Sequence, residues 1–280
     1  MEKKKQEKVL SLVLLVYIVC FIFRLFEYFI LRTDKTWVGE AVVHKLIGIV
    51  ILYLVVQMQG FSWRDIGFVK ENAMKYLLKG LVFGLGIFAI AYTIEVLIVM
   101  AQGRFASLQL YVSAYAVDRN IGYQTGIVFF LICVLGNVIN VIMEGGVFRG
   151  LFIRILERRY SFIVSVVISS VLFGLWHMVA PIRNYVDGTS SMGGMIANII
   201  MLVVTSGLVG FKFALLTKIT GNLYMALGDH FVNNTIVNML HVVSTTGVDE
   251  LMTLRLTIAQ SVSCVVVLIC YIFVNSKKEK

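Results

Sequence analysis

Long apolar runs of about 20 residues alternate with short polar segments along most of the chain. A helix of that length crosses roughly 30 Å of hydrocarbon. The pattern predicts about eight transmembrane helices, at residues 9–31, 38–58, 77–101, 127–155, 161–181, 195–217, 222–244 and 254–275. We expect the polar, aromatic segment 104–126 to be an outer loop or a re-entrant piece. We expect segment 59–76 to be an amphipathic stretch along the cytoplasmic membrane surface.

Composition favours a membrane protein over a soluble one. Hydrophobic residues make up 59% of the 280-residue chain and charged residues 15%, whereas a soluble domain carries roughly 25% charged residues. We therefore expect an all-α, polytopic membrane bundle that forms a single transmembrane domain over residues 1–280. The four cysteines lie inside apolar runs without metal-ligand spacing, so we interpret them as core residues.

The distribution of basic residues predicts the orientation of the bundle. With both termini in the cytoplasm, fifteen of the 25 Lys and Arg residues fall in cytoplasmic segments and six in outer loops, a clear positive-inside bias. The net charge of +9 requires no nucleic-acid partner, because basic residues facing an anionic inner leaflet account for it. The Lys- and Ile-rich composition and an uncleaved first helix suit a multi-pass protein of a bacterial plasma membrane.

Polar stripes run along three of the predicted helices, although an ionisable group in a bilayer costs on the order of 2.5–3.5 kcal/mol. Their members lie at helical spacing: Asn137, Asn140 and Glu144; Ser170, Gly174 and His177; and His230, Asn234, Asn238 and His241. If the fourth and fifth helices turn near Tyr160, Glu144 and His177 both lie roughly 25 Å from the turn and are level with each other. Arg24 and Glu27, at i and i+3 in the first helix, are predicted to pair.

These polar groups have the composition of a hydrolytic site. Glu144, shielded from water, can act as a general base toward a trapped water, and two imidazoles and a carboxamide can stabilise an oxyanion. Glu144, His177 and His230 could instead hold zinc. Because the sequence has no HExxH helix and Asn is a poor ligand, we favour a mechanism without a metal or other cofactor. The residues alone leave open a protease, a transport path, or a structural ion pair between Glu144 and Arg149.

Three motifs follow one another within a core of approximately residues 127–240: Glu144 to Arg149 (E-x-x-x-x-R), Phe173 to His177 (F-x-x-x-H) and His230 to Asn234 (H-x-x-x-N). In this order they resemble the CPBP family, the CAAX-protease and bacteriocin-processing enzymes, which include prenyl-protein endopeptidases of the Rce1 type. The resemblance implies an eight-helix membrane bundle. It also implies an intramembrane endopeptidase that hydrolyses a peptide bond of a membrane-embedded or lipid-modified substrate, among membrane lipids.

The resemblance assigns a role to each motif residue. Glu144 would activate the water with help from His177, and His230 and Asn234 would form the oxyanion-stabilising side. Arg149 would orient the glutamate region.

Phe173 would pack beside the site. One position departs from the family, whose first motif usually reads Glu-Glu-x-x-x-Arg: the second acid is Gly145 here. Arg149 would then lack its usual ion pair, and Asp229 is a candidate substitute partner.

Two other functions are compatible with the same residues. An acyl-transfer or lipoprotein-modifying enzyme on this scaffold would use the same base and oxyanion groups. A non-catalytic bacteriocin-immunity, binding or transport protein would keep the scaffold without needing Glu144.

Overall fold

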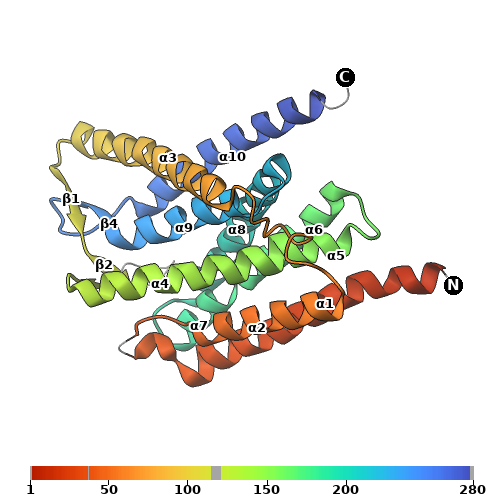
Figure 1. Ribbon diagram of the computed structural model, residues 1–280. Helices are drawn as coiled ribbons and strands as arrows, with labels where there is room; N and C mark the ends of the chain where they lie inside the picture. Colours follow the sequence, from red (N-terminus) through yellow and green to blue (C-terminus); the bar gives the residue numbers. More distant parts are fainter. Residues whose placement is uncertain (1, 37, 115–120, 278–280) are drawn as a thin grey trace.

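The computed structural model describes residues 2–36, 38–114 and 121–277 and is a bundle of helices with two small strand pairs (Figure 1). The α-helices are α1 (Glu2–Phe26), α2 (Val43–Met58), α3 (Ala73–Ala101), α4 (Ile127–Glu144), α5 (Ile153–Leu156), α6 (Phe162–Trp176), α7 (Val179–Val186), α8 (Met192–Thr220), α9 (Tyr224–Met239) and α10 (Met252–Ser276). Two π-helical segments, η1 (Glu27–Leu31) and η3 (Gly145–Phe152), and a 3-10 turn, η2 (Thr33–Lys35), interrupt or extend them. The strands are β1 (Ala106–Leu110), β2 (Val112–Ala114), β3 (Ile121–Gln124) and β4 (Leu240–Ser244).

Within the described residues, six helical segments are long and apolar enough to cross a membrane: Lys8–Lys35, Ala73–Ala101, Ile127–Leu156, Phe162–Val186, Met192–Thr220 and Met252–Ser276. The other two predicted spans correspond to shorter helices, α2 and α9, of 16 residues each. The predicted all-α polytopic bundle is confirmed.

The two ends of the described chain, at the start of α1 and the end of α10, lie at the same end of the bundle (Figure 1). An even number of crossings requires this arrangement, and the assignment of that end to the cytoplasm stays a prediction. Three of the charges used for that assignment, Arg119, Lys278 and Lys280, lie outside the described residues.

The opposite end carries a small β cap, defined by β1 to β4 and the loop from residue 245 to 251 (Figure 1). β1 pairs antiparallel with β4, with Leu110 opposite Leu240, and β2 pairs with β3. The described parts of segment 104–126 are therefore mostly strand. The predicted seventh helix also ends earlier than expected, at Met239, because the β-branched pair Val242 and Val243 continues as a strand against β1.

His241, predicted to continue the polar stripe of the seventh helix, lies instead on β4 and is fully buried. Its Nδ1 is 3.1 Å from Oδ2 of Asp249, and its ring stacks on Tyr111 at 3.8 Å between centroids. Burial favours the neutral form of Asp249, but hydrogen bonds from His241 and Arg255 outweigh it and hold the pKa of Asp249 below its ordinary value. Buried hydrogen bonds among His241, Asp249 and Arg255 thus hold the strands and the loop of the β cap together.

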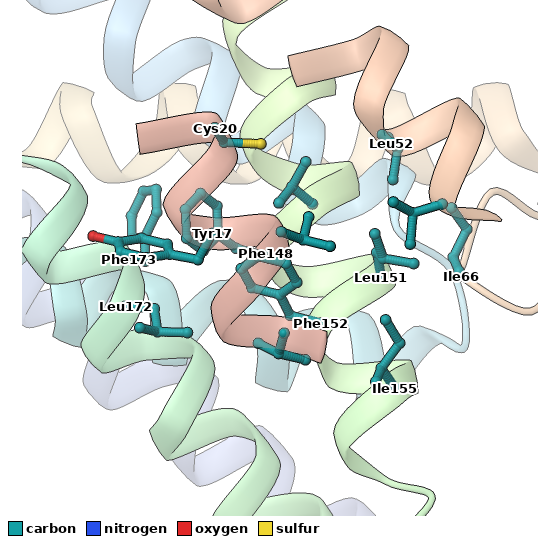
Figure 2. Packing of buried hydrophobic residues seen from close by; sticks show 14 of the residues in the cluster. Tyr17, Cys20, Leu52, Ile66, Phe148, Leu151, Phe152, Ile155, Leu172 and Phe173 are labelled. Carbon is teal, nitrogen blue, oxygen red and sulfur yellow. The ribbon is translucent and has the colours of Figure 1, made fainter. Parts of the chain in front are cut away.

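The largest hydrophobic core lies where α1, α2 and α6 pack around η3. Figure 2 shows side chains from these elements converging on Phe148. The Phe148 ring meets Phe152 at 5.3 Å and Phe173 at 5.1 Å, both edge to face. This packing fixes the chain immediately after Glu144.

Helices α3 and α9 touch through their backbones. A Cβ added at Gly80 of α3 would run into the carbonyl oxygen of Met225, and one at Gly228 of α9 would lie 2.5 Å from that of Leu77. Small residues of this kind let membrane helices approach closely. The helix that carries His230 is therefore fixed against a helix of 29 residues.

The segment between α2 and α3 differs from the predicted amphipathic stretch. It forms a series of turns over residues 59–72, and Ile66 within it is 2% exposed. A Cβ at Gly150 would lie 2.6 Å from the carbonyl oxygen of Ile66, so the turns pack directly on η3. This segment covers one end of the core, and its relation to a membrane surface stays a prediction.

Candidate active site

Glu144 is the last residue of α4, and the π-helix η3 follows it directly. The face of α4 that carries Asn137, Asn140 and Glu144 is buried, with exposed fractions of 2%, 7% and 3%. The polar stripe therefore points into the bundle. Short π-helical segments occur frequently at functional sites, and this one lies between Glu144 and the second residue of the same motif, Arg149.

Three side chains surround the carboxylate of Glu144. Trp176 donates from Nε1 to Oε1 at 3.2 Å, and Asn140 donates from Nδ2 to Oε2 at 3.4 Å. His230 Nε2 lies 3.6 Å from Oε2. Helices α4, α6 and α9 each contribute one of these groups, and Trp176 and Asn140 hold the carboxylate as donors where little water reaches it.

Helix α9 brings His230 and Asn234 to this carboxylate. Asn234 Nδ2 lies 3.3 Å from His230 Nε2, the same nitrogen that faces Glu144. Phe213 of α8 packs on the imidazole with ring centroids 4.7 Å apart, and Phe173 approaches it edge-on at 6.4 Å. The i, i+4 spacing of the third motif thus places both of its polar residues at the site.

His177 follows the last residue of α6 and is oriented by its own helix. Its Nδ1 donates to the carbonyl oxygen of Phe173 at 2.8 Å, so Nε2 carries the lone pair when the ring is neutral. Its ring meets that of Phe173 edge to face at 4.7 Å. The neighbouring residue, Trp176, makes the hydrogen bond to Glu144, so the end of α6 is level with Glu144 as the hairpin geometry predicts.

Arg149 is 4% exposed and has no carboxylate partner among the described residues. Its Nη1 donates to the main-chain oxygen of Glu144 at 3.2 Å. The guanidinium lies over the ring of Phe173 at 3.7 Å and that of Phe213 at 5.2 Å. Nε and Nη2 have no hydrogen-bond partner. Aromatic faces therefore compensate this cation where an acid would be expected.

The prediction that Asp229 replaces the missing acid is wrong. Asp229 Oδ2 lies 2.8 Å from Nζ of Lys212, a buried residue of α8, so its charge is already neutralised there. At Gly145, where the family has its second acid, the side chain of Leu227 fills the space: a Cβ at Gly145 would collide with Cδ2 of Leu227 on α9. The structural alternative of an ion pair between the Glu144 carboxylate and Arg149 is not formed either, since Arg149 contacts the main chain.

Sequence reasoning did not assign two of the groups that hold Glu144. Asn140 was visible as part of the polar stripe, and its i, i+4 spacing to Glu144 was the available signal. Trp176 lies beside His177 in an apolar run, and nothing local distinguishes its indole N–H from that of a core tryptophan.

A second polar cluster lies behind Trp176. Arg24 does not pair with Glu27 as predicted; both bind His44 instead, Arg24 at Nε2 (3.0 Å) and Glu27 at Nδ1 (2.5 Å). The Arg24 guanidinium also lies 4.5 Å from the Trp176 ring centroid. The residue after Glu27 in this cluster, Tyr28, accepts a hydrogen bond from Arg24 at 3.3 Å. The indole that binds Glu144 is therefore backed by a buried, charged scaffold.

The donor set for a metal is incomplete in this arrangement. Among the described residues no group of three or more His, Cys, Asp or Glu side chains is placed to hold a metal ion. Glu144 and His230 are close, but His177 is turned toward its own helix. A three-ligand zinc site needs all of them, and this arrangement brings only Glu144 and His230 together.

Comparison with known proteins identifies the family of this region. No curated protein matches the chain. Residues 126–236 match the family model described as type II CAAX prenyl endopeptidase Rce1-like. The matched residues run from the start of α4 to within α9 and include every residue of the three motifs. Over residues 126–236 the chain is therefore similar to the Rce1-like type II CAAX prenyl endopeptidases.

Proposed function

We propose that this multi-pass membrane protein is an intramembrane endopeptidase that hydrolyses a peptide bond of a membrane-embedded or lipid-modified substrate, with a water activated by Glu144. The observation that supports it most directly is the carboxylate of Glu144, 3% exposed and held by Trp176 and Asn140 opposite His230. A carboxylate fixed in this way needs no reorganisation to take a proton from a bound water.

In the proposed reaction, groups of the site accept and return the proton that the water loses. Glu144 accepts a proton as the water oxygen bonds to the carbonyl carbon of the substrate. The carbonyl oxygen becomes an oxyanion, to which the Asn234 amide donates beside His230. When the C–N bond breaks, the proton on Glu144 passes to the leaving amine. His177 lies on the side of the site formed by Phe173 and assists the water.

The first experiment compares membranes from cells that express wild type or Glu144→Gln, by mass spectrometry of protein N-termini and lipopeptides. General-base catalysis contributes about 10²- to 10⁴-fold, so we expect new N-termini in the wild type that fall by at least about a hundredfold in the variant. The matched control is Glu157→Gln, which removes a carboxylate that is 28% exposed and paired with Lys218 at 3.5 Å. This control should leave the products unchanged.

The same experiment separates the rival functions. Acylated N-termini without cleavage would establish the acyl-transfer enzyme instead. Identical product patterns in wild type and Glu144→Gln, with the cellular phenotype preserved, would show a non-catalytic immunity or binding protein. A chelator added to wild-type membranes should leave cleavage unchanged; loss of cleavage that zinc restores would contradict the metal-free mechanism.

A further inference from the structure

A row of polar side chains leads from α8 through α10 to the active site on α9. Each member contacts the next, from Lys212 Nζ to Gln260 Oε1 (3.2 Å), Gln260 Nε2 to Asn233 Oδ1 (2.5 Å), Asn233 Nδ2 to Asn234 Oδ1 (2.9 Å) and Asn234 Nδ2 to His230 Nε2 (3.3 Å). We call these five residues the amide chain. Three of them, Lys212, Gln260 and Asn233, are not among the residues that define the three motifs.

The direction of the amide chain is fixed at Lys212. An ammonium group has three N–H donors and no acceptor, and the Lys212 ammonium has three partners: Asp229 at 2.8 Å, Ser263 at 2.9 Å and Gln260 at 3.2 Å. Lys212 is 2% exposed, so its donors have little access to water. Gln260 must therefore turn its amide oxygen toward Lys212.

Each amide then determines the orientation of the next one. With its oxygen on Lys212, Gln260 can offer only its NH₂ group to Asn233, which accepts through Oδ1. Asn233 in turn offers its NH₂ group to Asn234. Asn234, accepting through Oδ1, is left with its NH₂ group facing His230.

This orientation decides the state of the imidazole. Because Asn234 Nδ2 is a donor, His230 Nε2 must accept, and a neutral imidazole that accepts at Nε2 carries its proton on Nδ1. The NH₂ group of Asn234 has a second hydrogen, which the contact with His230 does not use. Reversing the chain would present the Asn234 carbonyl to the site instead.

We propose that Lys212, Gln260 and Asn233 are positioning residues that impose one donor direction on the amide chain, so that Asn234 presents its N–H donors to the active site and His230 is held as the Nδ1–H tautomer. The catalytic meaning of this arrangement rests on the proposed function, because an amide donor stabilises the oxyanion and an amide carbonyl repels it. The orientation of the chain does not depend on that function.

The test reverses the chain by one substitution and reads the tautomer directly. In Gln260→Glu the new carboxylate still accepts from Lys212 but offers only acceptors to Asn233. Asn233 and Asn234 must then both turn over, and His230 must place its proton on Nε2. The ¹⁵N shifts of histidine nitrogens distinguish the two tautomers, and with 4 histidines in the chain the His230 signals are assigned by substituting the other histidines one at a time.

Two further variants keep the test decisive if one protein folds poorly. Asn233→Asp forces the same reversal one step closer to the site, while the contact between Lys212 and Gln260 stays intact. Ser263→Ala is the control: it removes another partner of Lys212, outside the amide chain, and should leave His230 as the Nδ1–H tautomer.

We expect the Nδ1–H tautomer of His230 in wild type and in Ser263→Ala, and the Nε2–H tautomer in Gln260→Glu and Asn233→Asp. Cleavage by the two reversed variants should fall by about a hundredfold in kcat with little change in KM, the usual effect of losing one oxyanion donor. An Nε2–H tautomer in wild type, or no change in either reversed variant, overturns the inference. If neither the wild type nor any variant cleaves a substrate but the tautomer switches as stated, the orientation stands and the proposed function fails.

Discussion

Two buried arginines of this protein are compensated in opposite ways. Arg255, at the β cap, is fully buried and binds two carboxylates, Glu95 at 2.5 Å and Asp249 at 2.7 Å. Arg149, at the candidate active site, is almost as buried but has no carboxylate partner in the described part of the chain; it lies between two aromatic rings and donates to a main-chain oxygen. Both residues are in the same bundle, so burial alone does not dictate how a guanidinium is neutralised.

The difference suggests two roles: Arg255 stabilises the fold, and Arg149 positions the main chain at Glu144. An ion pair with two acids is rigid, and removal of one partner leaves the others uncompensated. A guanidinium between aromatic faces can be removed without leaving a buried acid unpaired, and Arg149 of η3 binds the main chain of Glu144, not its carboxylate. We infer that the missing second acid of the first motif is part of this arrangement and not simply a loss.

The largest effect should come from Arg255→Met. The substitution leaves Glu95 and Asp249 buried without their cation, which typically costs about 3–5 kcal/mol of unfolding free energy. We expect a large fall in the melting temperature of the purified protein in detergent micelles. Combining Arg255→Met with Glu95→Gln and Asp249→Asn should recover much of the loss; a single variant as stable as wild type would show that this cluster is not structural.

A smaller effect is expected from Gly145→Glu, which restores the family's second acid. The new side chain must displace Leu227, and overpacking of a filled core usually costs about 1–3 kcal/mol. The double variant Gly145→Glu, Leu227→Ala provides the missing space and a carboxylate for Arg149. It should melt above the single Gly145→Glu variant. The same melting temperature for both would show that Leu227 is not what closes this position.

The smallest effect on stability is expected from Arg149→Met. It removes one hydrogen bond to a main-chain oxygen, worth about 1 kcal/mol, and cation–π contacts that are offset by the release of a buried charge. The melting temperature should therefore change far less than in Arg255→Met. Cleavage should still fall, because the carbonyl of Glu144 loses its donor. Equal destabilisation by the two arginine substitutions would remove the distinction between them.

Much of the fold could be predicted because its signals are local. Apolar length identified the long helices, and i, i+4 spacing placed His230 and Asn234 on one face of α9. The pairing of β1 with β4 could not be predicted, since it joins segments about 130 residues apart that carry no hairpin signal. The π-helix η3 was also invisible, because a sequence pattern gives no direct measure of a change in helical winding.

The site shows the same division. The motif residues Glu144 and His230 could be found by type and order, whereas their neighbours depend on tertiary contact. Lys212 looked like one more charge inside a helix, and only its position opposite Asp229 explains why Asp229 is not available to Arg149. A motif predicts which residues come together at the site. It does not predict which neighbouring residues neutralise their charges.

The backbone contact between α3 and α9 has a consequence for the surrounding lipid. A membrane helix longer than the local hydrocarbon layer tilts to fit it, and α3 has 29 residues. Because Gly80 and Gly228 bring the two backbones together, a tilt of α3 carries the shorter α9, and with it the imidazole of His230, to a new depth. Under the proposed function, bilayer thickness would then influence which bonds of a lipid-anchored substrate lie at the depth of this imidazole.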